Sequence, residues 1–176
     1  MMTRGLLILG ALLIFGGVNW QMERKERLRT SGQTVYLELA PVDPRSLMQG
    51  DYMALNFVLA RELGAGLSRE IESARPLPSS VAIVKVDGDR VGTFSRMDMG
   101  GPVGPGEVRF RFRVRRGNAW LGTNAFFFHE GEADRYRDAR YGEFRVGEDG
   151  EAMLVDLVGK DLRKLILVKP APVRDL

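Results

Sequence analysis

Alternation between apolar and basic side chains over residues 107–115 is the feature that most narrows the fold of this chain. The apolar set is Val108, Phe110, Phe112 and Val114, and the basic set is Arg109, Arg111, Arg113 and Arg115. Successive side chains of a β-strand point to opposite faces. The segment is therefore expected to be a strand with its apolar set in a core and its arginines outside.

Similar alternation recurs along the chain. Strands are expected over 34–42 and 52–60, with Met53, Leu55 and Phe57 on one face of the second. Hairpins are expected over 81–97 and 143–157, and a short aromatic strand over 124–128. The predicted non-strand segments are a glycine-interrupted loop with a short helix (61–80), a loop (100–106), a charged short helix (129–142), and a strand or short helix and strand (160–170). The predicted class is mainly β with short helices, an antiparallel barrel or sandwich, preceded by one N-terminal transmembrane helix.

The transmembrane prediction rests on Gly5–Trp20, sixteen almost wholly apolar residues without a charge. As a helix they span roughly 24 Å, a little less than a hydrocarbon core, and residues up to Met22 extend them to the interface. A cleaved signal peptide is the alternative, but the following residues offer no good small-residue cleavage site. Contact with the lipid bilayer is therefore expected through residues 5–22.

Helix formers continue over 21–31 and end at Gly32, which suits a helix C-cap. The predicted organisation is an anchor (1–22), a helical stalk (23–32), a β-rich domain (33–170) and a C-terminal tail (171–176).

The basic pI of 9.4 belongs to the N-terminal segment. Residues 1–32 hold five basic and two acidic groups, which leaves 21 of each sign in the remainder. A domain without net charge has no overall cationic field for phosphates, so no nucleic-acid partner is expected. The absence of cysteine excludes disulfides, thiolate metal sites and a cysteine nucleophile.

No motif of an established enzyme class is present in full. The single histidine, His129, is accompanied only by scattered carboxylates, so a structural role is favoured over a metal site. Residues 44–51 match only the second half of the motif that carries the nucleophilic serine of signal peptidases. Ser46 stands at the wrong spacing to be that serine. Lys85 has no feature that marks it as a general base. No catalytic residue, metal or cofactor is predicted.

The four arginines of residues 109–115 are the candidate binding site for an anionic partner, such as a glycan or lipid headgroup. The competing interpretation is that carboxylates on neighbouring strands neutralise them.

The segment "GDYMALNF" (Gly50–Phe57) resembles the signature of the GDYxxLxY family of bacterial membrane-anchored proteins, with Phe57 in place of the final tyrosine. The resemblance extends over most of residues 5–157. It implies an N-terminal span followed by an extracytoplasmic domain, and an association with polytopic membrane proteins. The structural motif comprises Pro44, Gly50, Asp51, Tyr52, Leu55 and Phe57. In physical terms, Pro44 and Gly50 shape a corner, Asp51 accepts backbone hydrogen bonds, and Leu55 and Phe57 enter the core.

The expected function is a non-enzymatic accessory or scaffold subunit that docks onto an integral membrane protein complex. The alternatives are a periplasmic module for an anionic ligand and, least favoured, a membrane-bound serine hydrolase. The basic residues after the span predict a cytoplasmic domain by the positive-inside rule. The family resemblance instead implies a domain on the periplasmic side of the bacterial inner membrane, and this placement is preferred.

Overall fold

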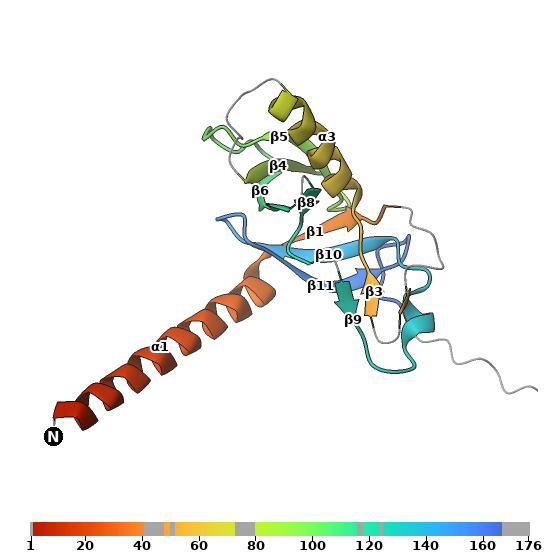
Figure 1. Ribbon diagram of the computed structural model, residues 1–176. Coiled ribbons are helices and arrows are strands. Elements are labelled where there is room, and N and C mark those ends of the chain that lie inside the picture. Colours follow the sequence, from red (N-terminus) through yellow and green to blue (C-terminus); the bar gives the residue numbers. More distant parts are fainter. Residues whose placement is uncertain are drawn as a thin grey trace, which may run out of the picture.

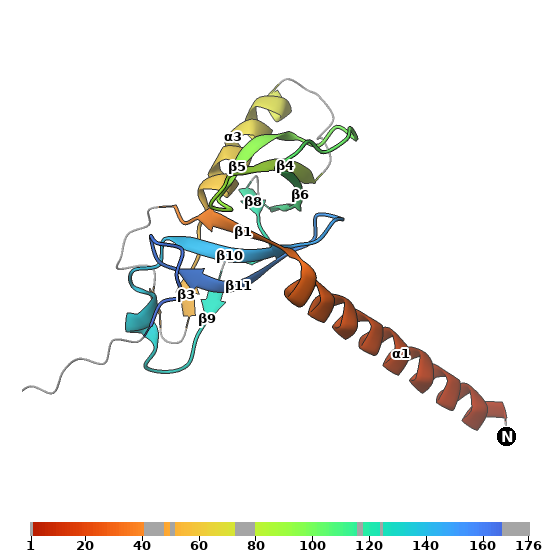
Figure 2. The same cartoon turned by 180° about the vertical axis from the view of Figure 1, so that it is seen from behind.

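The computed structural model describes residues 2–40, 48–49, 52–72, 80–115, 118–123 and 125–166. A long helix, α1 (Met2–Ser31), precedes a β-rich body. Both views show only the C-terminal end of α1 beside that body, with the N-terminus at the far end (Figure 1, Figure 2). Among the described residues, no helix combines the length and apolarity needed to cross a membrane.

The central sheet consists of three antiparallel strands in the order β1-β10-β11. Its strands are β1 (Gln33–Glu38), β10 (Tyr141–Val146) and β11 (Ala152–Val158). The core face of β1 holds Val35 and Leu37, and Phe144 of β10 lies opposite Val35; all three are fully buried. The alternation predicted for the start of 34–42 is therefore confirmed.

A second sheet, in the order β5-β4-β6, lies against the edge of β1. Its strands are β4 (Val81–Val86), β5 (Gly92–Met97) and β6 (Glu107–Arg111). The Tyr36 N–H donates to the Arg90 carbonyl at 2.8 Å, and the Arg111 N–H donates to the Gly150 carbonyl at 2.8 Å. These two bonds join the sheets, and a shared apolar core fills the space between them.

The remaining elements are small. The third sheet has the order β2-β3-β9, β7 pairs with β8, and one 3₁₀ helix precedes β10. Their bounds are β2 (Met48–Gln49), β3 (Tyr52–Ala54), α3 (Val58–Glu72), β7 (Arg113–Arg115), β8 (Asn118–Trp120), β9 (Ala125–Phe127) and η1 (Ala133–Tyr136).

The mainly β class is confirmed, but the barrel-or-sandwich architecture is not. The described strands form four small sheets of two or three strands, rather than one closed barrel or two facing sheets. The predicted hairpins over 81–97 and 143–157 are present as β4–β5 and β10–β11.

The predicted single strand over 107–115 is wrong beyond Arg111. β6 pairs with β4 as far as Val81, and the Phe112 N–H still donates to the Ser80 carbonyl at 2.9 Å. β4 does not continue before Val81, so the chain leaves this sheet and pairs again as β7 with β8. Val114, predicted to face the core, is 38% exposed as a result.

The segment 61–80, predicted as a glycine-interrupted loop with a short helix, holds a longer helix than expected in its described part. α3 covers fifteen residues and passes through Gly64 without interruption. Leu59 and Leu63, one helical turn apart, are 3% and 1% exposed. Burial of these leucines offsets the roughly 1 kcal/mol that a helical glycine costs relative to alanine. The strand predicted over 52–60 accordingly ends at Ala54.

Candidate functional site

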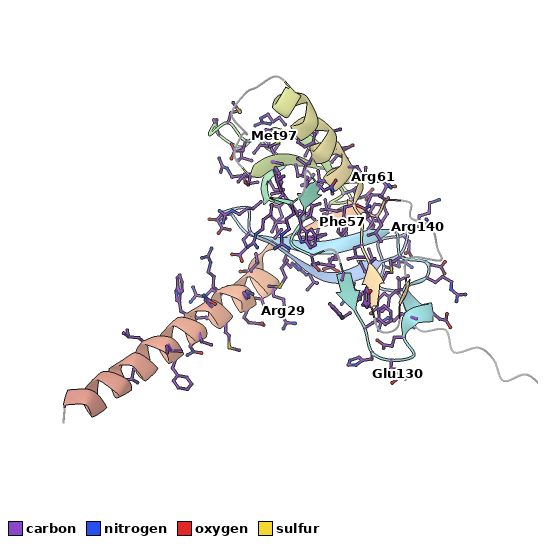
Figure 3. The ribbon with its side chains drawn as sticks, viewed as in Figure 1. Arg29, Phe57, Arg61, Met97, Glu130 and Arg140 are labelled. Carbon is purple, nitrogen blue, oxygen red and sulfur yellow. The ribbon has the colours of Figure 1, made fainter. Side chains whose placement is uncertain are left out.

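The signature motif is described in part: Pro44, Gly50 and Asp51 lie outside the described residues. Leu55 and Phe57 are 7% and 2% exposed, as the sequence predicts for a core face. The Phe57 ring packs edge-on against Phe144, with centroids 5.3 Å apart. This half of the motif therefore builds the core where α3 begins, and Figure 3 shows Phe57 inside the body beside that helix.

Tyr52 has a different environment from Leu55 and Phe57. It lies half-buried in β3, directly opposite Phe127 of β9, and the two ring centroids are 5.8 Å apart. Phe127 is 74% exposed, which is unusual for a large aromatic side chain. The two rings form an aromatic patch on the β3–β9 sheet, defined here as Tyr52 and Phe127.

The structure divides the four arginines of residues 109–115 into two pairs. Arg109 forms an ion pair through its Nε with Asp98 at 2.9 Å and donates to the Gly101 carbonyl. Arg111 donates to the Asp149 carbonyl at 3.0 Å. These two side chains hold loops of their own domain.

Arg113 and Arg115 are exposed on β7, and within the described part of the chain neither forms an ion pair with a carboxylate. The Arg115 guanidinium lies 4.9 Å from the centre of the Trp120 ring. The neutralisation expected from neighbouring carboxylates thus holds for Arg109, while Arg113 and Arg115 keep their charge on the surface.

Two carboxylates hold the loop between β5 and β6. The Gly100 N–H and the Arg109 side chain, in that order of effect, keep the pKa of Asp98 below its usual range. Glu107 pairs with Arg96 and accepts the Gly104 N–H at 3.0 Å, and both interactions lower its pKa. Both groups remain ionised at neutral pH and act as structural anchors for the loop.

A groove of about 620 Å³ opens between α3 and β8. Its buried floor is formed by Leu55, Phe57 and Leu121. The helix side is formed by Ala60, Arg61, Gly64 and Ala65, and the other side by Asn56, Thr123 and residues 118–120. The groove is not among the features predicted from the sequence, because the residues of α3 are divided there between a strand (52–60) and a loop with a short helix (61–80). Leu59 and Leu63 at helical spacing, beside small Ala60 and Gly64, are the signal that predicts it.

A second cavity, of about 700 Å³, lies where α1 meets the body. Arg24 bridges this junction, with its guanidinium 2.7 Å from an Asp149 oxygen and 3.2 Å from a Glu151 oxygen. The cavity also borders Leu28 and Gly32, so it belongs to the joint between helix and domain.

Two of the three rejected catalytic candidates are described. His129 is exposed after β9 and Lys85 is exposed on β4, while Ser46 lies outside the described residues. The described residues contain no cluster of three or more potential metal ligands.

These features define a class: a small β-rich domain carried on a long N-terminal helix, with the described residues of its motif in the core and on one aromatic patch. A family model described as "GDYXXLXY protein" matches residues 14–157. The chain therefore belongs to the GDYXXLXY family, as its signature predicts. Comparison with curated proteins and with solved structures finds no match.

Proposed function

We propose that the chain is a single-span membrane protein of the bacterial inner membrane. Its β-rich domain lies on the periplasmic side and docks, as a non-enzymatic accessory or scaffold subunit, onto an integral membrane protein complex. The described helix does not meet the apolarity of a membrane span, so the proposal rests on the sequence pattern of residues 5–22 and on the exposure of the described side chains from residue 12 onward.

The observation that carries the proposal is the exposure of apolar side chains around α1. The exposed fractions are 64% for Leu12, 69% for Leu13, 69% for Ile14 and 74% for Phe15. Four consecutive helical residues, about 100° apart, point to every side of the helix. An amphipathic helix covering the domain has one apolar stripe, whereas a helix that is apolar all round is buried in protein or in lipid.

The polar boundary of α1 supports insertion of the helix into the bilayer. Trp20 and Met22 are 63% and 66% exposed, and Arg24 follows with its guanidinium 6.0 Å from the Trp20 ring centre. Tryptophan and arginine side chains are typical of the membrane–water interface. Beyond Arg24, the helix forms ion pairs along its own surface, such as Arg27 with Glu23 at 2.5 Å.

For docking, the best-supported contact is the aromatic patch of Tyr52 and Phe127. Aromatic side chains are enriched at protein interfaces and charged ones are depleted at their centres. Phe127 is too exposed to contribute much to the domain's own stability. A protein partner that covers the patch would bury this ring.

Purification of the tagged full chain in a mild detergent tests the docking role. We expect a polytopic membrane protein to co-purify in a fixed ratio, and Phe127→Ala to weaken this association without lowering the melting temperature. Met99→Ala is the matched control, since Met99 is 85% exposed but lies in the loop after β5. Elution of the wild-type chain alone and monomeric would contradict docking. Protease digestion of intact spheroplasts tests the periplasmic placement.

A second candidate function is the binding of an anionic periplasmic ligand. The exposed charges of Arg113 and Arg115 favour it, while Arg109 and Arg111 are engaged within the domain. Replacement of Arg113 and Arg115 by alanine separates this function from docking, because loss of ligand binding with assembly intact supports only the binding module.

A further inference from the structure

One face of the β7–β8 hairpin gathers two cations, a carboxamide and an indole. Across this antiparallel pair, Arg113 lies opposite Trp120 and Arg115 lies opposite Asn118. Directly opposed residues, and residues two apart on one strand, share a face of the ladder. The hairpin face, defined as Arg113, Arg115, Asn118 and Trp120, therefore presents these four side chains together.

This face continues into the groove between α3 and β8. Asn118 and Trp120 belong to both, since they also line the groove. The volume of about 620 Å³ lies within the range of about 300–1,000 Å³ that is common for small-molecule sites. At Gly64 an added Cβ would meet no atom within 4 Å, so the α3 side of the groove has open space.

The two carboxamides that line the groove are available to a ligand. Asn56 and Asn118 are exposed, and neither carboxamide has a hydrogen-bond partner among the residues that the structure describes. The Asn56 backbone is fixed, because its carbonyl accepts the Ala40 N–H at 2.8 Å. Each carboxamide offers both donors and an acceptor, which is the combination that neighbouring hydroxyl groups require.

The charge around the groove selects an anion. Arg113 and Arg115 lie on the adjoining hairpin face, exposed and without an ion pair to the described residues. Arginine binds carboxylates through paired N–H donors. The half-buried Trp120 ring adds a flat apolar wall on which the C–H faces of a sugar ring can pack.

We propose that the groove between α3 and β8, with the hairpin face, binds a carboxylate-bearing carbohydrate. Arg113 and Arg115 bind the carboxylates, Asn56 and Asn118 bind hydroxyl groups, and Trp120 packs against a sugar ring. The inference rests on the second candidate function, for which it supplies the site and ligand class. It is independent of docking through the aromatic patch.

Fluorescence of Trp120 tests the proposal. The chain has two tryptophans, so Trp20→Phe leaves Trp120 as the only indole. The full chain with this substitution, in detergent micelles, is titrated with tri-galacturonic acid and, separately, with maltotriose. We expect a saturable change with the acidic trisaccharide, at least about tenfold weaker binding of the neutral one, and weaker binding at high salt.

Matched substitutions locate the site. Arg115→Gln and Asn118→Ala are each expected to weaken binding of the acidic trisaccharide by about tenfold. Arg163→Gln is the control, since its side chain is 86% exposed and lies after β11. Both hairpin positions are exposed, so the variants should keep the wild-type circular dichroism spectrum.

Three results would overturn the proposal: no saturable signal, equal binding of maltotriose, or equal weakening by Arg163→Gln. Competition by poly-glutamate as strong as by the acidic trisaccharide would also overturn it, in favour of an acidic peptide. None of these results bears on docking, which the co-purification experiment measures separately.

Discussion

At the scale of residues, Gly142 makes the packing of the signature residue Phe57 possible. A Cβ at this glycine of β10 would lie 2.9 Å from Cε1 of Phe57 and 2.9 Å from Cδ1 of Leu154. The core rings of Phe57 and Phe144 thus pack directly on a backbone without a side chain. Alternation alone predicts that Phe57 is buried, but only the structure identifies the partner that leaves it space.

Gly142→Ala is therefore expected to destabilise the domain by about 1–3 kcal/mol, because an added methyl group overpacks a core that has no room. Chemical denaturation followed by circular dichroism measures the change. Gly64→Ala is the matched control: a Cβ there meets nothing within 4 Å, and alanine favours the helix by up to about 1 kcal/mol. Equal stability of the two variants would contradict this account of the core.

At the scale of elements, the loop between β5 and β6 is held by charge rather than by apolar packing. Asp98 pairs with Arg109, and Glu107 pairs with Arg96. The sequence shows these charges within residues 96–109, but it does not show which carboxylate meets which arginine. The pairing depends on the register of β4 with β5 and with β6, and the β4–β5 register contains a shift between Ile83 and Val84.

The lowered pKa values of Asp98 and Glu107 predict a loss of stability in acid. Their unfolded-state values are about 3.9 and 4.3, so the unfolded chain takes up these protons first as the pH falls. The stabilisation is complete above the unfolded-state values and is lost as the pH falls through the folded-state values. Melting temperatures measured from pH 7 to pH 2 should therefore fall below about pH 4.5.

The variant Asp98→Asn/Glu107→Gln should show a shallower decline in melting temperature over this acidic range. Glu148→Gln is its control, since Glu148 is exposed and forms no ion pair with the described residues. An unchanged acid decline in the double variant would place the responsible carboxylates elsewhere.

At the scale of the whole molecule, periodicity predicted the strands better than their assembly. Val35, Leu37, Leu55 and Phe57 lie in the core as their spacing indicates. Whether strands form a barrel, a sandwich or several small sheets depends on where each partner strand ends. The pairing of β6 with β4, for example, ends at Arg111, because its partner Val81 is the first residue of β4. The groove likewise joins residues 55–65 to residues 118–123, a proximity that no local pattern encodes.

The joint between α1 and the body is another property of the assembled chain. The helix ends at Ser31 and β1 begins at Gln33, with Gly32 as the only residue between them. The Gly32 N–H donates to the Leu28 carbonyl at 2.9 Å, and a Cβ on Gly32 would lie 2.4 Å from that oxygen. Together with the ion pairs of Arg24, this close approach fixes the direction in which α1 leaves the domain.

The last prediction concerns insertion of the proposed anchor into the membrane. Leu13 is 69% exposed and lies inside the apolar run, so Leu13→Lys should disfavour insertion by about 2.5–3.5 kcal/mol. We expect the wild-type chain to remain in membranes after washing with alkaline carbonate, and the variant to be largely released. Gln21→Lys is the control, because it adds the same charge at the polar boundary, where a lysine side chain reaches the interface. Release of the wild-type chain, or retention of both variants, would contradict insertion of α1, and the exposed apolar helix would then require a protein partner to cover it.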